Sequence, residues 1–322
     1  MSDATPAPTT PLQLALAWLT LLGTFGVVIA GALVNAWQAA LSVPTWPLSY
    51  GHLLLPEWVG NTFYEQLHRL LVLLSTGLFA GLAWAARRAS RRLRRWVLGG
   101  LGLLATQVVL GGVVVLWLDP PLVAALHLLL AIAVVVVTGW IVVRLHGGIG
   151  AASGLDPTNT RRARRLLVLL LLQLVLGAIS RHPPFGQTAF IATTLAHVLT
   201  GLLIVVLAQI LGISVARRAD GGRRLLGAGL SLVALAQLAV GFWVFFVSPE
   251  PLDEQWPPPE GFPAAHALHI ALATLLVLGC ALLWARSARG EDGDGRGRGG
   301  RSATASEFHG TPPHPPSRRD AV

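Results

Sequence analysis

Residues 124–131, Ala-Ala-Leu-His-Leu-Leu-Leu-Ala, have a close counterpart at residues 266–273, His-Ala-Leu-His-Ile-Ala-Leu-Ala. Both stretches lie within long apolar segments, one in each half of the chain, and the match aligns His127 with His269. Similarity at such a separation indicates an internal repeat. The repeat predicts that the two halves of the chain fold alike.

A second match extends the repeat to another pair of apolar segments. Leu67-His68-Arg69-Leu70 aligns with Ala196-His197-Val198-Leu199, which makes His68 equivalent to His197. Each half therefore contributes two equivalent histidines.

Composition indicates a membrane protein. Of the 322 residues, 53% are hydrophobic and only 12% are charged, and the mean hydropathy is +0.63, which leaves too little polar surface for a soluble globule of this size. The net charge of +9 comes from arginines in short runs between apolar segments, which membrane topology explains better than nucleic-acid binding does. The single cysteine, Cys280, excludes an intramolecular disulfide and a Cys-x-x-Cys-His haem attachment.

Eight apolar segments are long enough to span a hydrocarbon core of about 30 Å. They lie at residues 12–34, 66–86, 96–117, 121–144, 164–180, 190–213, 223–247 and 264–285. Four helices per repeat is an even number, so both halves enter the membrane from the same side. The predicted fold is an all-α polytopic membrane protein, with eight transmembrane helices arranged as two parallel-repeated four-helix bundles.

The arginine runs follow the second, fourth and sixth segments, and the positive-inside rule makes these connections cytoplasmic. Both termini are then cytoplasmic, and the predicted location is the cell membrane. The predicted parts are a disordered N-terminus at 1–11, an N-terminal bundle at 12–146, a cytoplasmic linker at 147–163, a C-terminal bundle at 164–286 and a disordered cytoplasmic tail at 287–322.

The four aligned histidines, His68, His127, His197 and His269, all lie on even-numbered segments near the outer side. Helix rise places His68 roughly 6 Å, and the others about 9–10 Å, below the outer helix starts. Imidazoles that face each other across a bundle suit the two axial positions of an iron porphyrin. Zinc fits less well, since it takes three or four ligands in one place. The sequence predicts one pair per half, His68 with His127 and His197 with His269.

Other polar residues flank these histidines. Arg69 and Arg181 could bond haem propionates or simply reach the headgroups. His266 lies one turn from His269 and is an alternative ligand, although the repeat favours His269.

The third, fifth and seventh segments share a Gln-x-x-x-Gly spacing, which predicts close helix packing at the glycines. The pairs are Gln107 with Gly111, Gln173 with Gly177 and Gln237 with Gly241.

The two halves differ at one position. Glu65 lies three residues before His68, on the same helix face, whereas Thr194 holds the matching position before His197. A carboxyl group beside only one site indicates chemistry or proton transfer in the N-terminal half, or else an interfacial carboxylate. The Trp- and Pro-rich loop at 35–63 is either an aromatic belt at the headgroups or a lid over that site.

Together these residues resemble the haem A synthase family over most of residues 12–286. The similarity rests on Glu65-x-x-His68-Arg69, Gln107 to Gly112, Pro121 to His127, Gln173 to Gly177, His197 and His269. The resemblance implies that a ring methyl of haem O is oxidised to a formyl group, giving haem A for cytochrome oxidase assembly.

The resemblance also implies the role of each site residue. His197 and His269 would hold an iron-containing haem b, while His68 and His127 would flank the substrate haem O, with Glu65 important for catalysis. The implied partners are haem O, the lipid bilayer, a haem O synthase and oxidase assembly factors; nucleic acid is not among them. The sequence leaves a homo-oligomer open.

The chain departs from the family pattern in the first outer loop. Asn35 stands where the family commonly has Arg, Val43-Pro44-Thr45-Trp46-Pro47 replaces a Cys-Pro-Asp-Trp-Pro-like run, and the cysteine pair is missing. This favours a class of the family without that pair. Two other functions stay open: a di-haem b electron-transfer protein that modifies no porphyrin, and a transporter or channel with buried histidines and no haem.

Overall fold

The structure is a computed structural model that describes residues 9–53, 58–146, 156–181, 186–218, 221–248 and 257–298. Its helices are α1 (Pro11–Ala36), α2 (Asn61–Ala85), α3 (Arg91–Leu116), α4 (Pro121–Leu145), α5 (Pro157–Arg181), α6 (Gly186–Arg218), α7 (Gly222–Val247) and α8 (Phe262–Arg298), with a 3₁₀ turn, η1, at Ala86–Arg88. Within the described residues, eight helices are long and apolar enough to cross a membrane. The predicted all-α polytopic membrane fold is confirmed.

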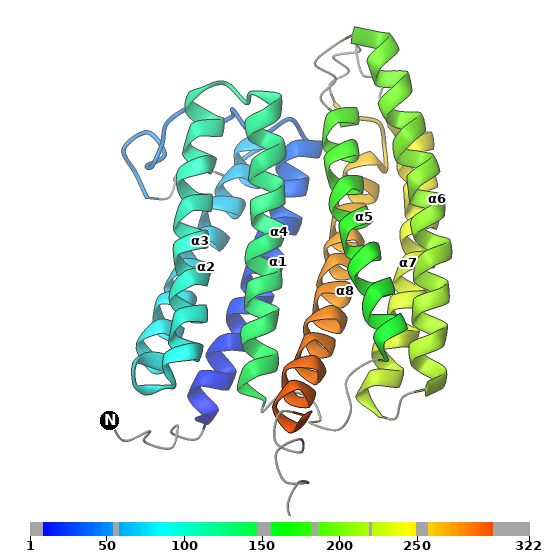
Figure 1. Cartoon of the computed structure of the whole chain (residues 1–322). Coiled ribbons are helices and arrows are strands. Elements are labelled where there is room, and N and C mark those ends of the chain that lie inside the picture. Colours follow the sequence, from blue (N-terminus) through cyan, green and yellow to red (C-terminus); the bar gives the residue numbers. More distant parts are fainter. Residues whose placement is uncertain are drawn as a thin grey trace, which may run out of the picture.

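The helices form two groups of four that stand side by side (Figure 1). In the first group α1 packs against α2 and α4, and α3 packs against the same two helices. In the second group α5 and α7 each pack against α6 and α8. Contacts of α8 with α1 and α4, and of α4 with α5, join the groups. The parallel relation between the halves stays a prediction.

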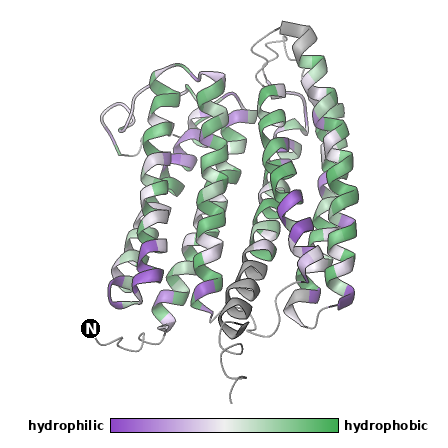
Figure 2. Cartoon of the chain, viewed as in Figure 1, coloured by the Kyte–Doolittle hydropathy of each residue, from purple (hydrophilic) through white to green (hydrophobic). Residues whose placement is uncertain are grey.

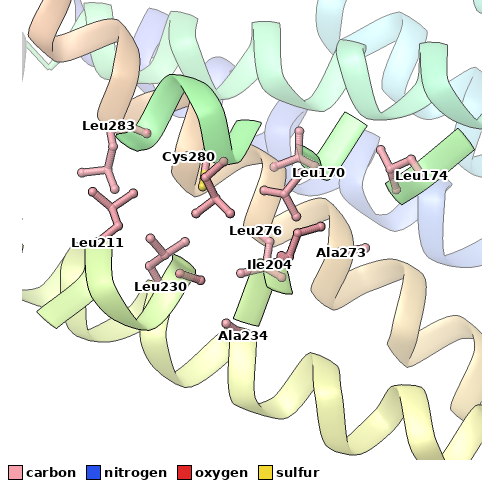
Figure 3. Close-up of a cluster of buried hydrophobic side chains, with 14 of the residues drawn as sticks. Leu170, Leu174, Ile204, Leu211, Leu230, Ala234, Ala273, Leu276, Cys280 and Leu283 are labelled. Atoms are coloured by element: carbon pink, nitrogen blue, oxygen red, sulfur yellow. The ribbon is translucent and has the colours of Figure 1, made fainter. Parts of the chain in front are cut away.

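Each group has its own apolar core, built by every helix of the group. Figure 3 shows part of the second core, where Leu170, Ile204, Leu230 and Leu276 converge from four helices. Ile132 of α4 also belongs to this core, so the first group contributes to the second. Burial of large aliphatic side chains contributes to holding the helices together, with close van der Waals packing.

The joint between the groups is tight. A Cβ atom added to Gly139 of α4 would lie 2.6 Å from Cδ1 of Leu278 on α8, which is too close for any real contact. The absence of a side chain at Gly139 therefore lets α4 and α8 approach each other.

Hydropathy along the helices matches a membrane setting. Apolar residues cover most of their length, and hydrophilic residues gather near the ends (Figure 2). The arginines of η1 and of the start of α3 lie at the end of the molecule opposite the α1–α2 loop (Figure 1). Large side chains such as Leu74, Leu232 and Phe246 are exposed, as expected for surfaces that face lipid.

Several helices run further than the apolar segments predict, because polar residues extend them beyond the apolar core. α2 starts at Asn61 instead of residue 66, which moves His68 deeper into its helix than the sequence estimate. α5 starts at Pro157, so residues 157–163 of the predicted linker are helical. α8 continues as a helix to Arg298, past residue 287 where the predicted tail begins. Residues 1–8, 147–155 and 299–322 of the predicted disordered and linker parts lie outside the described residues.

Asp156 explains the early start of α5. Its carboxylate accepts hydrogen bonds from the Asn159 backbone N–H (2.9 Å) and from the Arg218 guanidinium at the end of α6 (3.1 Å). The Asn159 bond, followed by Arg218, holds the pKa of Asp156 below its ordinary value of 3.8. A carboxylate at this position caps the helix and favours its N-terminus.

We expect Asp156→Ala to destabilise the protein by about 1 kcal/mol at neutral pH, the usual cost of a lost cap. Because the folded pKa is lowered, the charge-dependent part of this contribution is complete above pH 3.8 and is lost as the pH falls through the folded pKa. Thermal unfolding in detergent at pH 7 measures the effect. Asp156→Asn is the control, because it keeps a capping oxygen while losing the charge, and should be milder.

Candidate functional site

Each of the four predicted histidines lies against a glycine of the preceding helix. A Cβ atom added to that glycine would lie 2.9–3.2 Å from Cε1 of the imidazole, closer than nearly all real contacts. The four pairs are Gly31 with His68, Gly111 with His127, Gly177 with His197 and Gly241 with His269. We call each pair an imidazole seat. The glycines leave the room that lets the Cε1 edge of each ring approach the neighbouring helix.

Three of the seats include a glutamine four residues before the glycine. The amide Nε2 of Gln107 donates to the backbone carbonyl of His127 (2.9 Å), and that of Gln173 donates to the carbonyl of His197 (2.8 Å). In the fourth helix pair, Nε2 of Gln237 lies 3.2 Å from the imidazole Nε2 of His269. Each glutamine thus ties the histidine-bearing helix to its neighbour.

The seat of His68 differs, because Val27 occupies the position that glutamine holds in the other seats. The imidazole of His68 lies near the backbone of Val27. The first seat is therefore formed without a side-chain amide.

His197 and His269 face each other across the C-terminal group. Their ring centroids are 6.3 Å apart and their planes are inclined by 57°. Two metal–imidazole bonds of about 2 Å, each extended by about 1 Å to the ring centre, give roughly 6 Å. The observed separation would accommodate one metal ion between the two rings.

All four histidines line one cavity of about 1280 Å³. This exceeds the roughly 300–1,000 Å³ of a pocket for a single drug-sized ligand. Apolar side chains of both groups, such as Val108, Leu128, Ile204 and Ile270, form most of the wall. The cavity has the size and lining expected for large, flat, apolar ligands.

The donor set fits iron porphyrins better than a bare metal ion. Among the described residues no group of three or more His, Cys, Asp or Glu side chains could hold a metal. The Nδ1 atoms of the four seated imidazoles are buried, and none has a hydrogen-bond partner in good geometry within the part of the chain that the structure describes. Axial histidines of this kind bind iron through one nitrogen and direct the other toward a backbone carbonyl. The backbones of Val27 and Gln173, beside His68 and His197, provide such carbonyls.

Glu65 is almost fully buried and both carboxylate oxygens are engaged. Oε1 accepts from the Arg69 guanidinium (2.5 Å), while Oε2 accepts from the Val43 backbone N–H (2.7 Å) and from Ser42 Oγ (3.0 Å). Glu65 also lines the cavity together with His68. The carboxylate therefore lies beside the first histidine and holds the α1–α2 loop at the same time.

Arg69, like Glu65, binds the α1–α2 loop. Its guanidinium donates to the backbone carbonyls of Val43 and Thr45, both at 2.9 Å, and to Ser49 Oγ at 3.2 Å. Ser49 in turn donates to Gln66 at 3.2 Å. Three polar side chains near the start of α2, Glu65, Gln66 and Arg69, thus bind the segment 42–49.

The middle of that segment reaches α3. A Cβ atom added to Gly112 would lie 2.6 Å from the indole of Trp46, so the ring rests directly on the glycine. Trp46 also lines the cavity. Gly112 follows Gly111, the glycine that seats His127, so Trp46 and His127 lie at the same level of α3.

The remaining predicted positions are less central. His266 lies against Phe262, with ring centroids 5.5 Å apart, and lines the cavity one turn from His269. Asn35 also lines the cavity. Arg181 is the last residue of α5, and its side chain lies outside the described part of the structure.

Comparison with known proteins gives one informative match. The chain is 34% identical over 139 residues to a protein named heme A synthase from Ruegeria pomeroyi. The match covers 38% of this chain and 35% of the relative, so it spans about a third of each protein. This similarity supports the haem A synthase family. No protein-family model matches the chain.

The sequence repeat predicts the four histidines, but it predicts only a general packing role for the glycines of the Gln-x-x-x-Gly motif. The structure assigns each glycine to one imidazole. The available signal was the recurrence of Gln-x-x-x-Gly one helix before a histidine, which occurs three times. Gly31 lacks this signal, because Val27 stands four residues before it where the other helices have glutamine.

We expect Gly177→Ala to disturb the seat of His197, because the new Cβ would lie 2.9 Å from the imidazole. Loss of supporting contacts around a ligand usually costs about 10–100-fold in metal affinity. Haem retained after purification, measured by absorbance, reports the effect. Gly229→Ala is the control, since its Cβ would meet nothing within 4 Å; equal retention in both variants would contradict the role of the seat.

Proposed function

We propose that this protein is a membrane oxidoreductase that converts haem O to haem A. The observation that carries the proposal is the set of four seated histidines around one large apolar cavity. The similarity to a protein named heme A synthase supports the same reaction class.

In this proposal His197 and His269 bind a b-type haem in the C-terminal group. Their centroid separation of 6.3 Å supports a shared axial role. Gln173 fixes the helix that carries His197 through its carbonyl. A b-type haem supplies one-electron redox chemistry when bound.

His68 and His127 flank the substrate haem O in the N-terminal group. The overall change is two successive hydroxylations of one methyl carbon, followed by loss of water from the resulting gem-diol to leave the formyl group. In each hydroxylation one oxygen atom of an external oxidant of the dioxygen class enters a C–H bond, while two electrons from an external reductant and two protons convert the other oxygen atom to water. The residues of the chain orient the porphyrin, and the apolar wall excludes water from the reacting edge. Glu65 is the group placed to hold or move a proton near His68.

The proposed setting is the cell membrane, with both termini in the cytoplasm. The arginine-rich connections at one end of the helices support this orientation. A haem O synthase and oxidase assembly factors are the proposed partners, and self-association stays open.

A di-haem b electron-transfer protein is the second candidate. The observation in its favour is that both halves have the same glycine–histidine seats, which would suit two permanent haems as well as one cofactor and one substrate. Glu65 and the segment it holds separate the two functions, because only the synthase requires a specialised N-terminal half.

The test is co-expression with a source of haem O under aerobic conditions, followed by extraction and chromatography of the haems. Haem A is the expected product. A reduced-minus-oxidised spectrum with Soret and alpha bands but haem O alone in the extract would leave the electron-transfer function. A spectrum with no haem bands would overturn both.

A further inference from the structure

The segment 42–49 lies at the N-terminal half of the cavity and contacts both α2 and α3. On α2 it is bound by Glu65 and Arg69, which lie within one turn of His68. On α3 its Trp46 rests on Gly112, next to the glycine that seats His127. We call this segment the strap.

The strap is tied down by backbone contacts as well as by side chains. The N–H and carbonyl groups of Val43 are both bound, by Glu65 and Arg69 respectively, and the Thr45 carbonyl is bound by Arg69. Hydrogen bonds to charged groups are stronger than those between neutral groups. The position of Trp46 is therefore fixed from both sides.

Trp46, Pro47 and Leu48 line the same cavity as His68 and His127. Trp46 is only partly buried by the protein, so part of its indole is free to meet a ligand. A large aromatic surface held rigidly at little entropy cost is a common contact for flat apolar ligands.

We propose that Trp46 is a porphyrin-contacting residue, and that Glu65 and Arg69 position it through the strap. This inference rests on the proposed function, because it assigns the strap to the substrate half. The role of Glu65 here is additional to its proposed proton role.

The test compares Trp46→Ala and Gly112→Ala with Gly102→Ala. A Cβ at Gly112 would displace the indole, whereas one at Gly102, on the same helix, would meet nothing within 4 Å. We expect the first two variants to raise KM for haem O roughly tenfold, the effect of about 1.4 kcal/mol of lost contact, with a smaller change in kcat. Gly102→Ala should match the unaltered protein.

A binding measurement keeps the inference testable whatever the enzyme activity. Spectral titration with haem O and with iron protoporphyrin IX reports porphyrin binding directly, and the b-type spectrum of the C-terminal half reports folding. Weaker binding in Trp46→Ala and Gly112→Ala, with the b-type spectrum intact, supports the inference even if no haem A forms. Unchanged binding in both variants, or no porphyrin binding to the N-terminal half of the unaltered protein, overturns it.

Hydrogen exchange tests separately whether Glu65 holds the strap in place. The Val43 amide, which donates to Glu65, should exchange slowly in the unaltered protein and in Gly102→Ala, and quickly in Glu65→Ala. Equally fast exchange in all three would show that Glu65 does not hold the strap.

Discussion

Replacing His197 or His269 with alanine is expected to remove the stably bound b-type haem spectrum. Each variant deletes one of two facing imidazoles whose centroids are 6.3 Å apart, so the iron would keep one axial ligand at most. We expect haem content after purification to fall further than the loss of about 10–100-fold expected when only a supporting contact is removed. Pyridine haemochrome absorbance per mole of protein measures it.

His266→Ala is the matched control for this prediction, because His266 lies one turn from His269 on the same helix and also lines the cavity. Its removal should leave the spectrum in place. If His266→Ala lost the haem while His269→Ala kept it, the alignment of His269 with His127 would be wrong.

Glu65→Ala is expected to keep the b-type spectrum and to lose the product. Glu65 lies in the N-terminal group, far along the chain from the His197–His269 pair, and its partners are Arg69, Val43 and Ser42. Loss of a group that transfers protons typically lowers kcat by about 10²–10⁴-fold. Haem A formed per unit of b-type haem measures the effect.

Glu65→Gln separates the two roles of this carboxylate. The amide oxygen can still accept from the Val43 N–H, so we expect haem O to bind normally while kcat falls about 100-fold. Recovery of full activity in Glu65→Gln would exclude a proton role and leave only the strap. Loss of the b-type spectrum in either Glu65 variant would contradict the separation of the two halves.

The number and order of the helices could be predicted from apolar length alone, because hydrocarbon thickness sets a narrow range for a membrane helix. The residues at which the helices begin and end could not be predicted in this way. The start of α5 depends on the cap at Asp156 and on its contact with Arg218, a residue 62 positions away. Apolar length contains no information about such a contact.

The four histidines could be predicted because they recur in a repeat. Their contacts with other residues could not, because these contacts depend on the tertiary structure. Glycine is compatible with many packing roles, and only the structure pairs Gly31 with His68. The contact of Trp46 with Gly112 joins a loop to a distant helix and leaves no periodic trace in the sequence. Glu65 was recognised as unusual, yet its bonds to the α1–α2 loop could not be read from its neighbours.

The seats also bear on assembly in the membrane. In each of the four cases the glycine and the histidine belong to consecutive helices, α1 with α2, α3 with α4, α5 with α6 and α7 with α8. Helices insert first and associate afterwards, so a single inserted hairpin already contains everything needed to orient its own imidazole. The facing ligand of each pair arrives with the next hairpin. A porphyrin bound between the two histidines of a pair would then connect two helical hairpins that have already formed. Ligand binding would therefore be a late step of assembly that stabilises the association of these hairpins.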